Sequence, residues 1–264
     1  MPRRRIAEDP TSRLAIWARR LALFALAVAL LAIVVVRLDF IEIVPGLATF
    51  GGAIGIAVIA MLFAFGAFVV IWREGLKGFG HALLAFVIGI GLVTYPAYLG
   101  AKAYRLPPLA DITTDLSDPP RFEAIARLRP REANPVAYPG AAAAELQRAT
   151  YPQIAPLQTS STPAELYEAA LGVVTKRKWR LIETRSPQVG RREGRIEAVA
   201  RTALMGFRDD IVIRVRPISG GARLDIRSAS RYGQRDFGAN AQRVLGLLED
   251  IEDAATPQPE PRAR

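Results

Sequence analysis

The sequence predicts an α+β protein: a three-helix transmembrane region followed by a soluble domain with an antiparallel sheet of about four strands and two flanking helices. Three observations indicate this. The first hundred residues hold three apolar runs of roughly membrane-spanning length. A proline-rich stretch follows, which cannot form one long regular element. The remaining residues alternate between helical and period-two hydrophobic patterns in the order helix, strands, helix.

The apolar runs predict transmembrane helices, because a spanning helix needs about 20 apolar residues. The second and third runs are uncharged over that length, whereas the charge-free part of the first, Leu21–Val36, is slightly short. A signal peptide is the alternative for the first run, but Val34–Val36 leads into Arg37 without a small-x-small cleavage site, which favours an uncleaved helix. The predicted spans are about 14–36, 47–72 and 79–101 within a region of residues 14–104.

Basic residues flank the apolar runs unevenly, which predicts the orientation of the chain. One side carries Arg3, Arg4, Arg5, Arg13, Arg19, Arg20, Arg73 and Lys77, and the other carries Arg37, Lys102 and Arg105. The more basic side is expected in the cytoplasm, so residues 1–13 form a cytoplasmic N-terminus and the chain from about residue 105 lies outside. The expected interface anchors are Trp17 and Trp72 inside, and Tyr95, Tyr98 and Tyr104 outside.

Two features of the spans bear on partners and transport. Gly51 and Gly55 form a G-x-x-x-G face, for which packing within the three-helix unit is the favoured interpretation and a homo-oligomer contact is the alternative. No span has an Asp, Glu, Lys or Arg at mid-depth, which argues against a transporter. The only predicted partners in this region are membrane lipids and possible copies of the chain.

Composition excludes several chemistries. The chain has no cysteine and a single histidine, His81, at the edge of an apolar run. Disulfides and cysteine metal sites are therefore excluded, histidine catalysis and zinc sites are disfavoured, and no cofactor or metal is predicted. The net charge of +10 and the pI near 10.5 are typical of nucleic-acid binding, but much of the excess flanks the apolar runs. Nucleic acid is not a predicted partner.

Residues 105–160 are predicted as a Pro-rich tether, 161–254 as the soluble α+β domain and 255–264 as a disordered tail. The domain begins at Thr162, a good N-cap that Pro163 and Glu165 extend into a capping box. A strand over Trp179–Thr184, a turn at Pro187–Gly190 and three alternating strands come next. The alternating strands are Arg195–Ala203, Asp210–Arg216 and Arg223–Arg231, with a hairpin turn at Gly220–Gly221.

A final helix capped by Asp236 follows the last strand. Its expected apolar face contains Phe237, Ala241, Val244, Leu248 and Ile251. With both helices on one face of the sheet, the opposite face is unusually basic. It would carry Arg195, Arg201, Arg214, Arg216, Arg223 and Arg227, with only Glu197 and Asp225 to balance them.

Two polar motifs identify a family. GFRDDIVIRV (Gly206–Val215), followed by RSASRYGQRDFGAN (Arg227–Asn240), resembles the bacterial and plastid family catalogued as domain of unknown function 1499. The resemblance covers roughly residues 111–252 and includes DITTD at Asp111–Asp115. Phe237 stands where an aliphatic residue is expected, a departure that leaves the polar positions intact. The resemblance implies no established activity; with the orientation above, it implies a bacterial inner-membrane protein with a periplasmic domain.

Three function classes stay open. The favoured one is binding of an anionic envelope ligand, such as a lipid head group, a wall polymer or an acidic protein. Its candidate anion site is Arg227, Ser228, Ser230, Arg231, Arg235, Asp236 and Asn240. The second is a purely structural scaffold in which Asp209, Asp210 and Arg214 act as structural polar residues, Asp210 facing Arg214 and Arg227. The third is a hydrolase-like enzyme that would use Asp209–Asp210, or Ser228 or Ser230 with Lys176 or Lys178; without histidine or cysteine it is disfavoured.

Overall fold

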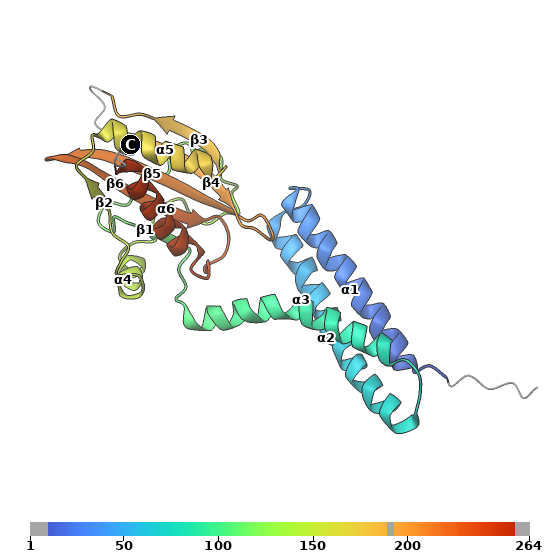
Figure 1. The fold of residues 1–264 in the computed structure, drawn as a ribbon. Coiled ribbons are helices and arrows are strands. Elements are labelled where there is room, and N and C mark those ends of the chain that lie inside the picture. Colours follow the sequence, from blue (N-terminus) through green and yellow to red (C-terminus); the bar gives the residue numbers. More distant parts are fainter. Residues whose placement is uncertain (1–9, 189–192, 257–264) are drawn as a thin grey trace, which may run out of the picture. The chain divides into compact units, whose positions relative to one another are not determined.

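The computed structural model describes residues 10–188 and 193–256, which form two compact units divided after Lys102 (Figure 1). Each unit has its own core. Some predictions fall outside the described residues. They concern Arg3, Arg4 and Arg5, the Val189–Gly190 end of the predicted turn, and the predicted tail from residue 257.

The first unit consists of three helices that are long and apolar enough to cross a membrane, as the sequence predicts. They are longer than the apolar runs because polar residues at the ends continue the helical hydrogen bonding. The helices are α1 (Arg13–Arg37), α2 (Ile43–Glu74) and α3 (Phe79–Arg105). They indicate a membrane protein.

Helices α1 and α2 pack through facing stripes of alanine. The buried alanines of α1 recur every three or four residues from Ala15 to Ala32, and those of α2 do so from Ala53 to Ala67. Alanine lets two backbones approach closely, which favours dispersion contacts where no water is available to drive association. The bulky apolar side chains consequently point away from the helix pair, as the exposure of Phe24 and Leu62 illustrates.

The glycines that permit close packing are not those singled out in the sequence. A Cβ placed on Gly46 would lie 2.0 Å from Val36 Cγ2, and one on Gly89 would lie 2.2 Å from Met61 Cγ. A Cβ on Gly51 or Gly55 would meet nothing within 4 Å among the described residues. The favoured interpretation of Gly51 and Gly55 as packing residues within the three-helix unit is therefore wrong. Spacing alone does not show which side of a helix faces its neighbour.

The second unit is an antiparallel sheet in the order β1-β6-β5-β4-β3, with β2 also paired to β6. Helices α5 and α6 lie on one face (Figure 1). The strands are β1 (Asp111–Thr113), β2 (Leu157–Thr159), β3 (Arg180–Arg185), β4 (Gly194–Arg201), β5 (Arg208–Ile218) and β6 (Gly221–Ser230). The helices are the 3-10 turn η1 (Ile125–Arg127), α4 (Ala141–Thr150), α5 (Pro163–Lys176) and α6 (Ala239–Ala255).

The helical face of the sheet forms the main core. Its strands contribute alternate residues such as Ile213 and Ile226, which pack against Leu166 of α5 and Val244 of α6. The predicted capping box at Thr162 is confirmed, with its side chain and that of Glu165 each bonded to the other's backbone N–H. In α6, Leu247 is buried in place of the predicted Leu248, which is only partly buried.

Residues 105–160, predicted as a tether, contain β1, η1, α4 and β2 and pack on the sheet. The part from Thr114 to Tyr138, hereafter the covering segment, lies across the face opposite the helices. Phe122 and Ile125 of this segment pack against Val199 and Val212. Strands of three residues are too short to show alternation in sequence, so β1 and β2 bring the sheet to six strands instead of about four.

Candidate functional site

Arg227, the first residue of the predicted anion site, is buried within the domain. Its guanidinium pairs with Asp111, at 2.9 Å from Nε to Oδ1 and 2.7 Å from Nη2 to Oδ2. It also donates to the carbonyl oxygens of Pro120 and Val136. The rings of Phe122 and Tyr138 lie 4.7 and 5.5 Å from its Cζ. Arg227 therefore fastens the covering segment and β1 to β6.

Tyr138 belongs to the same arrangement. Burial and the nearby Asp111 carboxylate raise the pKa of Tyr138 to about 12, so the ring beside Arg227 stays neutral. Its hydroxyl is buried without a hydrogen-bond partner among the described residues.

Arg231 and Asp210 form a second buried group. Arg231 Nε lies 2.9 Å from Asp210 Oδ1, and Arg129 Nε of the covering segment lies 2.6 Å from Asp210 Oδ2. The sequence places Asp210 opposite Arg214 and Arg227, and the structure corrects these partners. Asp210 pairs in register with Ala229, and the covering segment brings in Arg129 from far along the chain.

The serines of the predicted site lie on the other face of the sheet. Ser228 Oγ donates to Asn240 Oδ1 at 2.7 Å, and Asn240 Nδ2 donates to Ser230 Oγ at 2.9 Å. Arg243 donates to Ser228 Oγ at 3.0 Å and to Asp209 Oδ2 at 2.5 Å. Successive side chains of a strand alternate between faces, so β6 separates Ser228 and Ser230 from Arg227. The structure does not bring the seven predicted residues together, and these serines hydrogen-bond locally.

Asp236 and Arg235 complete the predicted set. Asp236 accepts hydrogen bonds from the backbone N–H groups of Gly238 and Asn240, at 2.8 and 2.7 Å. Burial raises the pKa of Asp236 above its usual value, these hydrogen bonds oppose the rise, and the Asp209 charge adds to it. Helix α6 begins at Ala239 with Gly238 as the N-cap, so the predicted cap, Asp236, lies two residues ahead of the observed one. Arg235 is exposed and donates to backbone carbonyls.

Arg214 lies in a balanced ionic cluster at one end of the covered face. The cluster contains Arg214, Arg216, Arg223, Asp115, Asp118 and Asp225. Three positive charges thus meet three negative ones. Burial opposes ionisation of Asp115, but hydrogen bonds from Asp118 and Ser117 and the charge of Arg223 outweigh it and lower the pKa of Asp115. The arginines at this end are structural.

Glu197 holds the turn of the covering segment at η1 against the sheet. Its fully buried carboxylate accepts the backbone N–H groups of Glu123 and Ile125, at 2.6 and 2.7 Å. These donors lie at the start of η1, where backbone N–H groups lack partners within the helix. A charged acceptor in a dry site makes a strong hydrogen bond, so Glu197 fixes η1 on the sheet.

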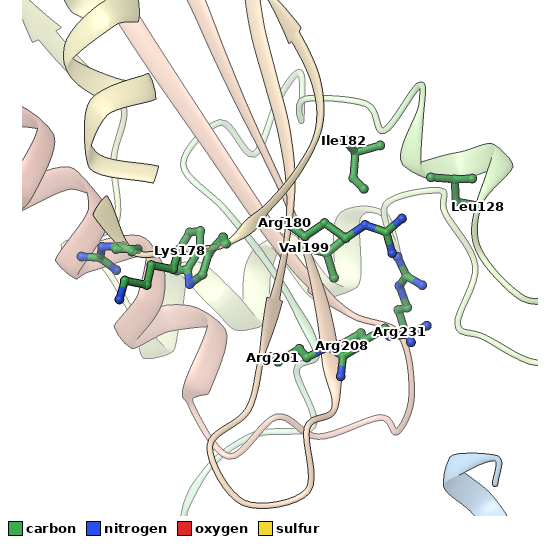
Figure 2. Close-up of a pocket in the computed structure, with 10 residues that line it drawn as sticks. Leu128, Lys178, Arg180, Ile182, Val199, Arg201, Arg208 and Arg231 are labelled. Carbon is green, nitrogen blue, oxygen red and sulfur yellow. The ribbon is translucent and has the colours of Figure 1, made fainter. Parts of the chain in front are cut away.

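The opposite end of the covered face is lined mainly by cationic and apolar side chains. A surface pocket, hereafter the basic pocket, lies beside Leu128 of the covering segment (Figure 2). Arginines from strands β3, β4 and β5 surround it together with Arg231, which directly follows β6, and apolar side chains lie between them. Its lining residues are Leu128, Arg177, Lys178, Trp179, Arg180, Ile182, Val199, Arg201, Arg208 and Arg231.

The strand register concentrates positive charge in this pocket. Arg201 of β4 is the direct cross-strand partner of Arg208 in β5, and the backbone N–H of Arg231 donates to the Arg208 carbonyl at 3.2 Å. Like charges directly opposite each other in a sheet reduce stability. Lys178 adds a further cost, because its φ of 55° is a left-handed conformation that favours glycine. The pocket therefore gathers cations from several neighbouring segments of the domain.

Part of this pocket was not predicted from the sequence. Arg201 was expected on the basic face and Arg231 in the anion site, and Lys178 was expected only as a candidate partner of a catalytic serine. Arg180 and Arg208 were not singled out. Arg208 had a usable signal, because Arg201 and Arg208 flank one hairpin and must face each other. Arg180 had no such signal in the sequence, because its position in the sheet depends on a register shift between Leu181 and Glu183.

The described part of the chain contains no candidate metal-binding site. Within residues 10–188 and 193–256, no three His, Asp or Glu side chains are grouped so that they could hold a metal ion. The buried carboxylates are instead engaged by arginines and backbone N–H groups.

Comparison with known protein families confirms the resemblance that the two polar motifs indicate. The model of the family described as Protein of unknown function (DUF1499) matches residues 111–251, more than half of the chain. The match begins at β1 and includes the covering segment, so the family unit is larger than the predicted domain of residues 161–254. A search of curated proteins finds no match. The chain belongs to the DUF1499 family, whose domain it carries behind three helices able to span a membrane.

Proposed function

We propose that the protein is a membrane-anchored binding module whose basic pocket takes a ligand bearing a phosphate or carboxylate group. The observation that carries this proposal is the exposed pair Arg180 and Lys178 in the lining of the basic pocket, together with the buried Arg231. The described lining of the pocket includes no carboxylate side chain. Cations gathered around one pocket favour a ligand of the opposite charge.

The chemistry of the lining fits an anion with an uncharged part. Arginine presents a planar fork of N–H groups that matches phosphate and carboxylate oxygens. Arg231 is buried, and it shares the single carboxylate of Asp210 with Arg129, so this group retains one uncompensated positive charge. Trp179 and Ile182 offer apolar surface to the rest of the ligand.

The basic pocket replaces most of the predicted anion site as the location of binding. Arg231 belongs to both sets, whereas Arg227 has its donors engaged by Asp111 and backbone carbonyls. The proposal keeps the predicted class of ligand and changes the residues that hold it. It also includes the orientation expected from the basic flanks, with the domain outside the cytoplasm. A reporter that is active only in the cytoplasm, fused to the C-terminus, is expected to be inactive.

Binding can be tested with glycerol 3-phosphate as the probe and the full chain in neutral detergent micelles. Calorimetric titration is expected to show salt-sensitive binding, since exposed charges are screened by ions. Arg180→Gln should weaken it at least ten-fold, because each charge-assisted contact contributes about 1.5–3 kcal/mol. The matched control is Arg235→Gln, an exposed arginine of the predicted loop site.

The two variants distinguish three outcomes. Loss in Arg180→Gln with retention in Arg235→Gln supports the basic pocket. The reverse pattern would assign binding to the loop site and overturn the proposal. Binding of the probe by neither the parent nor the variants would favour the scaffold function, in which the charges only hold the chain or a partner together.

A further inference from the structure

The cations of the basic pocket lie at two separate ends. Figure 2 shows the side chain of Lys178 extending to one end of the pocket, and the guanidinium groups of Arg180 and Arg231 extending to the other. Lys178 and Arg180 are two residues apart, so their Cα atoms are at most about 7 Å from each other. Because the two side chains diverge from there, their charged groups are too far apart for one phosphate group to contact both.

The end at Arg180 has a buried positive charge beside it. The side chains of Arg231 and Arg129 are 5% and 3% exposed, and they share the single, fully buried carboxylate of Asp210. Arg129 Nη2 is buried without a hydrogen-bond partner among the described residues. Salt screens buried charges much less than exposed ones. This end of the pocket therefore attracts an anionic group more strongly than the exposed Arg180 would alone.

Lys178 is held at the other end by an unusual backbone conformation. It follows Arg177, the C-cap residue of α5, and its φ of 55° is a left-handed conformation that favours glycine or asparagine. Its backbone N–H donates to the carbonyl of Thr175 at 2.9 Å. Arg177 is paired with Asp250 at 2.6 Å, whereas Lys178 is exposed. The second end of the pocket thus has its own positive charge, at a position where the backbone favours a residue without one.

Apolar surface separates the two ends. Val199 lies between Lys178 and the guanidinium group of Arg180 in Figure 2, and Trp179 also lines the pocket. The Trp179 ring is fixed by Arg177, whose Cζ lies 5.3 Å from the ring centroid. The pocket volume of about 460 Å³ is typical of sites that hold a whole small molecule, roughly 300–1,000 Å³. The lining therefore presents a cation, an apolar middle and a second cationic end to one ligand.

We infer that the ligand of the basic pocket carries two anionic groups, such as two phosphates, joined by a chain that crosses the apolar middle of the pocket. Arg180, beside Arg231, binds one group, and Lys178 binds the other. The inference rests on the proposed function and specifies the class of its ligand. Two weak contacts joined by one chain reinforce each other, because the second contact forms at a high effective concentration once the first is made.

Matched phosphate probes test this in the full chain in neutral detergent micelles. Hexanediol bisphosphate has a phosphate at each end of a six-carbon chain, and hydroxyhexyl phosphate has the same chain with one phosphate. By calorimetric titration, the bisphosphate is expected to bind at least about ten-fold more tightly, since the contact with Lys178 adds a charge-assisted hydrogen bond. An advantage of only about two-fold, which two equivalent phosphates give by statistics alone, would overturn the inference.

The variant Lys178→Gln tests the second contact, and Lys176→Gln is its matched control. Both changes remove one exposed lysine, but Lys176 lies within α5 and is not a lining residue of the pocket. Lys178→Gln should abolish the advantage of the bisphosphate, whereas Lys176→Gln and the charge-conserving Lys178→Arg should retain it. Equal losses in Lys178→Gln and Lys176→Gln would overturn the inference, because they would reflect only the net charge of the protein.

Pyrophosphate, in which the two phosphates are adjacent, separates a two-ended site from simple attraction of charge. Lys178→Gln should weaken pyrophosphate binding only slightly, because this compact probe stays at the Arg180 end. A loss as large as that for hexanediol bisphosphate would overturn the inference.

Glycerol 3-phosphate distinguishes failure of this inference from failure of the proposed function. If the parent binds glycerol 3-phosphate and Arg180→Gln does not, while the bisphosphate has no advantage over hydroxyhexyl phosphate, the two-group ligand is refuted and the proposed function stands. If the parent binds none of these probes, both are refuted.

Discussion

The two ends of one sheet face use arginine in opposite ways. At one end, Arg214 and Arg227 are buried beneath the covering segment and bound to carboxylates. At the other end, Arg180 and Arg201 are exposed and share a pocket with Arg208 and further cations. Both ends of the face are rich in arginine, but Arg214 and Arg227 are buried whereas Arg180 and Arg201 are exposed.

This difference separates buried charges that stabilise the fold from exposed charges that contribute little to its stability. A buried arginine with a bidentate carboxylate partner makes the covering segment part of the domain, and loss of one partner leaves an uncompensated charge. An exposed group of like charges adds repulsion and contributes little to folding. Substitutions in the covered region should therefore lower stability, whereas substitution of the exposed Arg180 or Lys178 of the basic pocket should leave stability unchanged or raise it.

The largest expected effect is the removal of the partner of Arg227. Asp111→Ala should lower the free energy of unfolding by about 3–5 kcal/mol, because it leaves a buried guanidinium without its carboxylate. Urea denaturation of the full chain in detergent, followed by near-UV circular dichroism, measures this. The control is Asp118→Ala, whose side chain is 59% exposed and which should cost below about 1 kcal/mol. Equal losses for the two variants would contradict the distinction between buried and exposed pairs.

A smaller loss is expected at Glu197. Glu197→Gln keeps the shape of the side chain but replaces one acceptor oxygen with an NH2 group that faces a backbone N–H donor. The free energy of unfolding should fall by about 1–3 kcal/mol, since a buried donor loses its partner. Hydrogen exchange should also become faster at Glu123 or Ile125. Glu123→Gln, an exposed change in the same turn, serves as the control, and unchanged exchange in Glu197→Gln would refute the anchoring role.

A substitution at Lys178 is expected to raise the free energy of unfolding instead of lowering it. Lys178→Gly removes the cost of a left-handed lysine and should raise the free energy of unfolding by about 1 kcal/mol. The same change should weaken glycerol 3-phosphate binding, because it removes a cation from the pocket. Lys176→Gly, two residues earlier and within α5, should instead lower stability by about 0.5–1 kcal/mol. A loss of stability in Lys178→Gly would mean that the backbone there is not strained.

The smallest effect concerns pH and contrasts Asp115 with Asp236. The pKa of Asp115 is lowered, so its contribution is present above the usual value of 3.8 and is lost as pH falls through the lowered value. The pKa of Asp236 is raised by burial, so its ionised form lowers stability at neutral pH, and this cost disappears as pH falls through the raised value. Asp236→Asn should gain stability relative to the parent as pH rises from about 3 to 7. Urea denaturation across this pH range measures the difference, and a flat or opposite trend would refute it.

Much of the architecture was predictable because it depends on local patterns. Apolar length identified three helices able to span a membrane, and alternation identified β4, β5, β6 and the faces of their side chains. Capping chemistry located the start of α5 at Thr162. The same alternation already separated Ser228 from Arg227, and grouping them in one anion site overlooked it.

The sequence by itself determined which residue types face each side of the sheet, since helical and strand periods are properties of adjacent residues. Only the tertiary structure decided what those residues meet. Asp111 and Arg227 are far apart in sequence, and their pairing depends on β1 joining the edge of β6. Arg180 and Arg231 share a pocket because strand order and a register shift in β3 place them together. Such contacts arise from the packing of distant segments, and no local pattern of residues encodes them.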